Sequence, residues 1–144
     1  MAVRTPSMWT ISDHILHSAC RTPHLGEFGF EEVLRYTGEG GYVNHAEMKI
    51  GEHGRIFMGD PGDQYKSPKR LGQETCGIYV QIDGGVDELC ERARSAGATI
   101  KEEPVDQEYG ERRFTAEDLE GQVWFFGQEI KQVAPEEWGA EVAS

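Results

Sequence analysis

Residues 77–103, GIYVQIDGGVDELCERARSAGATIKEE, contain a strand, a helix and the start of a second strand. Ile78, Val80 and Ile82 alternate with other side chains, and a period of two is typical of a strand that buries one face. From residue 86 onward the apolar residues recur at intervals of three and four, which predicts a helix with one buried face over 86–96. This stretch therefore predicts a strand that reaches its successor through a packed helix.

Three further strands are expected after the helix, at residues 99–103, 112–118 and 122–127. Pro104 is expected to end the first of them, because proline has no backbone N–H to donate to a neighbouring strand. The second half of the chain is therefore predicted to run strand, helix, strand, strand, strand.

The first half repeats the strand part of this order. Strands are predicted at 31–37, 42–50 and 55–58, with glycine-containing turns between them. A shift of 67 residues places GRIFM at 54–58 on GQVWF at 121–125, with glycine on glycine. A matching segment within a repeated order of elements indicates an internal duplication.

The doubled unit resembles the glyoxalase/bleomycin-resistance/extradiol-dioxygenase superfamily, also called the vicinal oxygen chelate proteins, and within it the bleomycin-resistance branch. The segments that carry the likeness are VDEL at 86–89, SAGA at 95–98, YGERR at 109–113, DLEGQVW at 118–124, HAEMKIG at 45–51 and MGD at 58–60. The resemblance implies an α+β fold in which two βαβββ modules form a curved mixed sheet around a cleft, with the helices on the convex side. It also implies a homodimer.

Applied to the 144 residues, this interpretation gives a single domain. Its parts are module one at about 7–58, a linker or lid at 59–75, module two at 76–130 and an acidic tail at 131–144. Residues 7–27 should supply the first strand and helix of module one, but Pro23 stands where the interior of that helix is expected. An alternative interpretation of this segment is a metal-binding cluster of His14, His17, Cys20 and His24.

Metal-dependent members of the superfamily carry four ligands, on the first and last strand of each module. Carried over residue by residue, those positions fall on Trp9, Met58, Gly77 (or Cys76) and Phe125. None of them is the His, Asp or Glu that a divalent ion prefers. No cofactor is therefore predicted, and a divalent metal is expected only if other residues serve as ligands.

The candidate site is an apolar cleft with a few polar groups, which is typical of small-molecule binding. Apolar residues on the last strand of each module alternate with Phe57, Trp124 and Phe126, so one set is expected to face the cleft and the other the helices. No catalytic residue is predicted. The candidate ligand-binding residues are His45, Glu47, Ile56, Met58, Tyr79, Gln81, Tyr109, Arg112, Val123 and Phe125.

Particular contributions are expected from the polar and aromatic members of this set. Tyr79 is expected to stack on a planar ligand. Arg112 or its neighbour Arg113 would anchor an acidic group of the ligand. His45 and Glu47 lie two apart on one face of a strand, where they could act as acid and base.

Composition limits the partners. Twenty-six acidic residues against fourteen basic ones give a formal charge of −12, which disfavours nucleic acid and anionic membrane surfaces as partners. No apolar run approaches the ~18 residues of a membrane span. Three cysteines without paired spacing fit a reducing compartment, so a cytoplasmic location is expected.

The function predicted from these observations is the binding of a small apolar or aromatic molecule in a metal-free cleft, as in resistance or sequestration proteins. One alternative is a metal-dependent lyase, isomerase or dioxygenase with non-standard ligands, such as His45, Glu47 and an N-terminal histidine. A second alternative is a non-catalytic interaction subunit that uses the long loop and the acidic tail as contacts.

Overall fold

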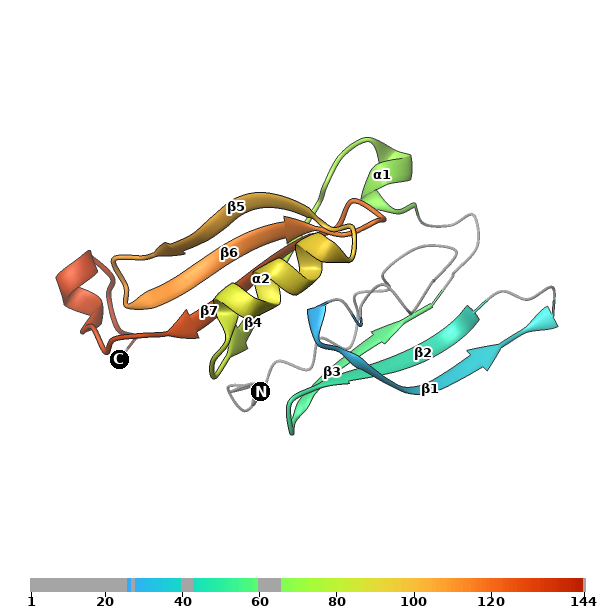
Figure 1. Ribbon diagram of the computed structural model, residues 1–144, viewed down its shortest axis with the longest axis horizontal. Coiled ribbons are helices and arrows are strands. Elements are labelled where there is room, and N and C mark those ends of the chain that lie inside the picture. Colours follow the sequence, from blue (N-terminus) through green and yellow to red (C-terminus); the bar gives the residue numbers. More distant parts are fainter. Residues whose placement is uncertain (1–25, 27, 40–42, 60–65, 144) are drawn as a thin grey trace.

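The computed structural model describes residues 26, 28–39, 43–59 and 66–143, which form two β-sheets with few helices (Figure 1). The first sheet has the strand order β1-β2-β3, and the second has the order β4-β7-β6-β5. The strands are β1 Glu31–Thr37, β2 Val43–Ile50, β3 Gly54–Met58, β4 Gly77–Ile82, β5 Thr99–Asp106, β6 Glu111–Glu117 and β7 Val123–Glu129. The α+β class is confirmed, as is the predicted order of these strands along the chain.

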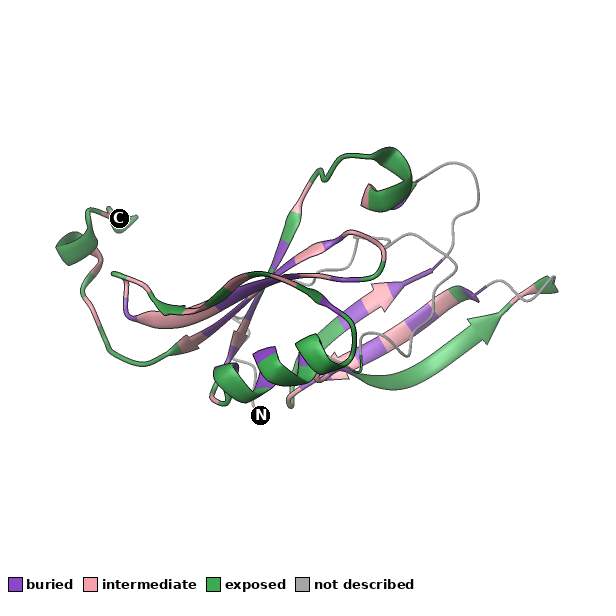
Figure 2. Cartoon of the chain, turned by 45° about the horizontal axis from the view of Figure 1, so that its top comes forward, coloured by how far each residue is buried: buried purple, intermediate pink, exposed green. Residues whose placement is uncertain are grey.

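The second sheet contains a complete strand–helix–strand–strand–strand unit. Strand β4 pairs in parallel with β7, while β7, β6 and β5 pair antiparallel. Helix α2, Val86–Ser95, connects β4 to β5 and packs on one face of the sheet through its buried side chains (Figures 1 and 2). Gly85 precedes the helix with a φ of 75°, and Gly97 follows it with a φ of 104°. Both values lie in the left-handed region that favours glycine, so these residues fix where the helix begins and ends.

Strand β5 differs from the prediction, because it continues through Pro104 to Asp106. Its register against β6 shifts between Glu102 and Val105, so Pro104 lies inside an irregularity of the ladder. Strand β5 is also at the edge of its sheet. An edge position and a bulge are the two places where a strand tolerates a residue without a backbone N–H.

The first sheet buries mainly one face. Its buried side chains are Val43, Ala46, Met48, Ile50, Ile56 and Met58, and the pairing of β2 with β3 places the last five on a common face. Strand β1 is exposed along its whole length (Figure 2). The strand and helix that the resemblance implies at residues 7–27 lie almost entirely outside the described residues.

Two phenylalanines before β1 connect the first module to the core of the second. Phe28 lies 5.7 Å from Trp124 and 5.1 Å from Phe126, measured between ring centroids. Phe30 meets Trp124 edge-on at 5.5 Å. All four rings are buried, and a buried aromatic side chain contributes strongly to a core because of its large apolar area.

The predicted linker at 59–75 is not wholly irregular, because it contains the short helix α1, Pro68–Leu71. The fully buried Ser67 caps it by accepting a hydrogen bond from the Arg70 N–H at 3.3 Å. The Lys69 N–H donates to the Glu120 carbonyl at 3.0 Å, which fixes α1 to the turn between β6 and β7. The signals for this helix, a serine before a proline, are those of an ordinary helix start.

The tail folds back onto the turn between β5 and β6. The N–H groups of Ile130 and Lys131 both donate to the Gly110 carbonyl, at 2.9 and 3.1 Å. The 3₁₀ helix η4, Pro135–Trp138, then places the Trp138 ring 5.8 Å from that of Tyr109. Among the described residues, no helix has the length and apolar character needed to span a membrane.

Candidate functional site

The second sheet has two faces of different character, which follow from its register. Ile78, Val80 and the residues that pair with them, Trp124 and Phe126, face helix α2 and are buried. The residues between them face the opposite way. These are Gly77, Tyr79, Gln81, Val123 and Phe125. The predicted separation of Tyr79 and Gln81 from the buried isoleucines and valine of β4 is therefore confirmed.

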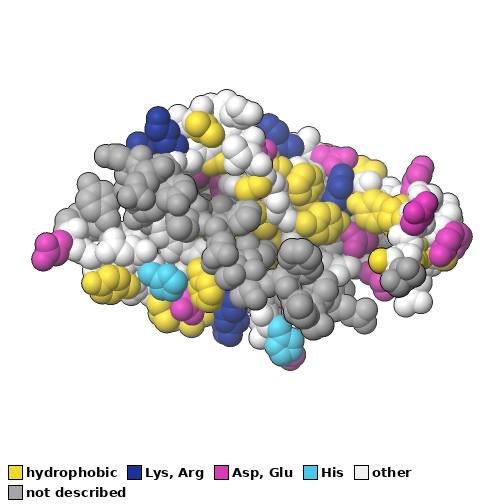
Figure 3. Space-filling view, turned by 180° about the vertical axis from the view of Figure 1, so that it is seen from behind, with side chains coloured by type: hydrophobic (Ala, Val, Ile, Leu, Met, Phe, Trp, Pro, Cys, Tyr) yellow, Lys and Arg dark blue, Asp and Glu magenta, His cyan; other side chains and the backbone are white. Residues whose placement is uncertain are grey.

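Aromatic rings occupy the face away from α2. Tyr79 and Phe125 stack with their centroids 6.1 Å apart and their planes 14° from parallel. The guanidinium carbon of Arg113 lies 5.4 Å from the centroid of Phe125, which is a cation–π arrangement. Seen from this side, hydrophobic side chains gather over the second sheet with a basic group among them (Figure 3). We call the side chains of Tyr79, Gln81, Tyr109, Glu111, Arg113 and Phe125 the aromatic face.

Two glycines make room for these rings. A Cβ placed on Gly77 would lie 2.5 Å from Cε2 of Phe125, and one placed on Gly127 would lie 3.1 Å from Cζ of Tyr79. Real Cβ atoms essentially never lie as close as 2.5 Å to another heavy atom. The Phe125 ring therefore requires the absence of a side chain at residue 77.

Glu111 organises the polar edge of the aromatic face. Its Oε2 accepts a hydrogen bond from the Tyr79 hydroxyl, and its Oε1 accepts one from Gln81 Nε2 at 2.8 Å. Burial raises the pKa of Tyr79 far above its usual range, and the hydrogen bond to Glu111 and the charge of that carboxylate raise it further. Tyr79 is therefore a hydrogen-bond donor here rather than a phenolate.

Arg113 is held by groups of the sheet itself. Its NH2 donates to Glu102 Oε2 at 3.0 Å, and its NH1 donates to the Tyr109 hydroxyl at 3.4 Å. Burial works to lower the pKa of Arg113, but the hydrogen bond and charge of Glu102 outweigh it, so the pKa is raised. Arg113 Nε is buried and has no hydrogen-bond partner among the described residues.

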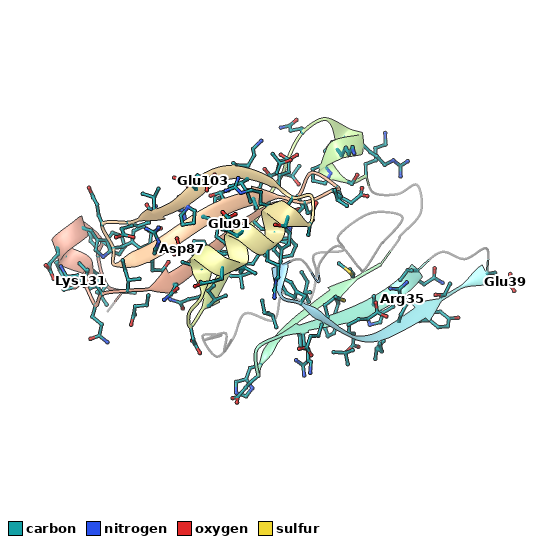
Figure 4. The ribbon with its side chains drawn as sticks, in the orientation of Figure 1. Arg35, Glu39, Asp87, Glu91, Glu103 and Lys131 are labelled. Carbon is teal, nitrogen blue, oxygen red and sulfur yellow. The ribbon has the colours of Figure 1, made fainter. Side chains whose placement is uncertain are left out.

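Arg112 does not belong to this face. It pairs with Gln128 of β7, on the helix side of the sheet, and donates to both oxygens of Asp87 on α2 at 2.9 Å. A third hydrogen bond, at 2.7 Å, reaches Asp106. Figure 4 shows Asp87 on the helix. Of the two neighbouring arginines that could have contributed to the site, the structure places Arg113 over Phe125 and turns Arg112 away.

The candidates from the first module lie on two opposite faces of the first sheet. Ile56 and Met58 are 2% and 3% exposed and belong to its buried face. His45 and Glu47 face the other way, with His45 Nε2 3.2 Å from Glu47 Oε1 and the His45 ring 5.6 Å from that of Phe57. The four therefore do not form one site.

Gly77, Met58 and Phe125, three of the residues at positions where the resemblance implies metal ligands, do not suit a metal ion. Gly77 has no side chain, and the Phe125 ring lies over it. Met58 offers only a thioether in a buried position, which is a poor ligand for hard or borderline cations. Trp9 lies outside the described residues, as do His14, His17, Cys20 and His24.

One group of potential ligand atoms does occur in the described part of the chain, namely Cys90, Glu91 and Glu103. Arg94 already occupies it, with NH2 2.6 Å from Glu103 Oε2 and 3.4 Å from Glu91 Oε1. Figure 4 shows these carboxylates on α2 and β5. Burial raises the pKa of Cys90, which opposes formation of the thiolate that binds metals. We therefore assign no metal to this group.

Sequence reasoning did not include Glu111 or Gly127 and preferred Arg112 to Arg113. The alternation of side chains along β6 could have distinguished the two arginines. Phe114 and Ala116 are apolar and buried against the helix side, so Arg112 shares their face while Arg113 takes the other. Glu111 then falls on the same face as Arg113.

Comparison with known proteins places this architecture among described families. Residues 26–126 match the model of the Glyoxalase/Bleomycin resistance protein/Dioxygenase superfamily. An uncharacterised protein of Mycobacterium bovis is 29% identical over 125 residues, which cover 84% of this chain and 82% of that protein. An uncharacterised protein of Mycobacterium tuberculosis is also 29% identical, with 73% of its length covered.

Solved structures of other proteins share this fold. The crystal structure of TioX from Micromonospora sp. ML1 superposes with a TM-score of 0.60 at 26% identity, covering 85% of this chain and all of that one. A glyoxalase family protein from Bacillus cereus superposes with a TM-score of 0.63, over 81% of this chain and 90% of that one. At 17% identity the second likeness concerns the fold alone. The chain belongs to the Glyoxalase/Bleomycin resistance protein/Dioxygenase superfamily.

Proposed function

We propose that this protein binds a small, mostly apolar or aromatic molecule on the aromatic face, as a resistance or sequestration protein, without a metal and without changing the molecule chemically. The observation that carries the proposal is the stacked pair of Tyr79 and Phe125, in which Tyr79 keeps 44% of its surface exposed. A half-exposed ring on a sheet offers a flat apolar surface to a planar ligand. Such stacking is worth about 0.5–1.5 kcal/mol beyond the buried area.

The surroundings of the pair support the same function. Gln81, Tyr109 and Glu111 place hydrogen-bonding groups at the edges of the rings, and the half-buried Val123 adds apolar surface on the same side. A mostly apolar surface with a few fixed polar groups is the usual composition of a small-molecule site. The absence of a metal is part of the proposal because Gly77 and Phe125 have no side-chain ligand atom and Met58 offers only a buried thioether.

A fluorescence titration with acridine and with 9-aminoacridine, two planar probes of the same ring system, tests this function. Binding of either probe is expected, and Tyr79→Ala should weaken it about tenfold, which corresponds to ~1.4 kcal/mol. Tyr36→Ala is the matched control, because Tyr36 is 62% exposed but lies on β1 in the other sheet. Equal binding by wild type and Tyr79→Ala would show that the function does not reside on this face.

We also propose that the protein is cytoplasmic, as its cysteine usage suggests, and that it is a homodimer, which the resemblance implies. The exposure of β1 supports a partner, because Val33, Leu34 and Tyr36 are 47%, 43% and 62% exposed on an edge strand. Exposed apolar edge strands are normally avoided or covered. In sedimentation experiments, Val33→Lys should shift a dimer toward monomer, whereas Leu71→Lys on α1, where Leu71 is 50% exposed, should not. A monomeric wild type would refute this assembly.

The enzyme alternative has one observation in its favour, the hydrogen bond between His45 and Glu47. Such a pair could transfer protons or supply two metal ligands. One tightly bound ion per chain that His45→Ala removes would favour this alternative over binding alone. A stable complex with a different protein would instead favour the non-catalytic subunit.

A further inference from the structure

The two charged side chains on the aromatic face, Arg113 and Glu111, differ in whether they have a partner of opposite charge. Its only cation among the described residues, Arg113, is already engaged, because it donates to Glu102 and lies over the Phe125 ring. Thr115 donates to the same Glu102 oxygen at 3.1 Å and helps to fix that carboxylate. An acidic ligand group would therefore have to displace Glu102 from Arg113, which disfavours the anchoring of an acidic group that was expected for Arg112 or Arg113.

Glu111 is in the opposite situation. Among the described residues, its two oxygens accept hydrogen bonds only from the neutral donors Tyr79 and Gln81. In the described part of the chain, no lysine, arginine or histidine forms an ion pair with it. The residue that pairs with it across the sheet is another acid, Glu129. The carboxylate of Glu111 thus lacks a counter-charge beside an exposed aromatic ring.

Resting on the proposed function, we infer that the ligand of the aromatic face is a planar cation, whose ring lies against Tyr79 and whose charged nitrogen faces Glu111. A cation in this place is attracted electrostatically by the carboxylate and by the negative faces of the aromatic rings. The net charge of −12 also raises the local concentration of cations around the whole molecule. An anion of the same shape would meet Glu111 and Glu129, and in the described part of this face the one cation, Arg113, is already paired with Glu102.

Three probes with one ring system but different charges test the inference near pH 7.5. 9-Aminoacridine is a cation, acridine is neutral and acridine-9-carboxylate is an anion. For wild type we expect 9-aminoacridine to bind about tenfold more tightly than acridine, and the carboxylate to bind most weakly. Glu111→Gln keeps an oxygen acceptor for Tyr79 but removes the charge, so it should reduce the affinity for 9-aminoacridine about tenfold and that for acridine by much less.

Glu52→Gln is the matched control, because it removes one acidic charge from the exposed turn between β2 and β3. It should leave all three affinities unchanged. If acridine or its carboxylate binds wild type as tightly as the cation does, the inference is wrong while the proposed function stands. If none of the three probes binds, the proposed function fails and the inference fails with it. The wild-type series decides the question even if Glu111→Gln does not fold.

Discussion

The ring of Phe125 lies over Gly77, at a distance where a Cβ on residue 77 would approach Cε2 to 2.5 Å. Phe125 comes from the last strand of the second module and Gly77 from its first, the two strands that the family resemblance associates with metal ligands. Here an aromatic ring fills the space above a residue without a side chain. The same ring then stacks on Tyr79, so the residue at one implied ligand position also builds the aromatic face.

Gly77→Ala should destabilise the fold, because its methyl group would overlap the Phe125 ring. Overpacking of this kind typically costs about 1–3 kcal/mol, measurable as a lower urea midpoint. Gly84→Ala is the matched control, since the nearest atom to a Cβ there is Gln128 Nε2 at 4.0 Å. Equal stability of the two variants would show that the Phe125 ring does not depend on Gly77.

Tyr79 should remain protonated at pH values where an ordinary tyrosine, with a pKa of about 10, ionises. Because burial and Glu111 raise its pKa in the folded protein, the unfolded chain releases this proton first as pH rises. The stabilising contribution is therefore fully present below the unfolded pKa and is lost at higher pH. In urea unfolding, the free energy of unfolding of wild type should fall faster than that of Tyr79→Phe above about pH 10. Parallel pH profiles would contradict this account.

Glu111→Gln should lower the pKa of Tyr79, since a neutral amide replaces the carboxylate whose charge opposes phenolate formation. The phenolate absorbance of the folded variant should then appear at a lower pH than that of folded wild type. Burial of Tyr79 is unchanged by this substitution, so part of the upward shift should remain. An unaltered absorbance titration would show that Glu111 does not act on Tyr79.

Arg112→Gln should affect stability slightly and probe binding not at all, because Arg112 contacts Asp87 and Asp106 on the far side of the sheet. Its hydrogen bonds lower the pKa of Asp87, so their contribution is present above the unfolded pKa of Asp87 and is lost as pH falls through the folded one. Exposed pairs of this kind contribute little to stability, because water screens the two charges. A tenfold loss of acridine binding in this variant would place Arg112 in the site after all.

Much of the second module could be predicted because its local signals agree with one another. The alternation of apolar residues in β4 and their helical periodicity in α2 each show which face of the element is buried, without reference to the rest of the chain. The helix ends within one residue of the predicted limit. The course of β5 through Pro104 could not be predicted in the same way, since it depends on β5 being an edge strand, which is a property of the whole sheet.

The site was only partly accessible from sequence for a related reason. Tyr79 and Phe125 could be assigned to a shared face from strand parity, but their stacking depends on the parallel register of β4 and β7. The pairing of Arg113 with Glu102 crosses a register shift in β5. Local pattern does not predict where such a shift occurs. The burial of Ile56 and Met58 likewise follows from tertiary packing, not from their alternation with Phe57.

The most direct test of the account is a titration of wild type and Tyr79→Ala with 9-aminoacridine, with and without EDTA, on protein whose metal content has been measured by mass spectrometry. The account predicts one saturable site per chain in wild type, unchanged by EDTA and about tenfold weaker in Tyr79→Ala. Binding that requires a stoichiometric ion, or that is indifferent to the loss of Tyr79, would contradict it.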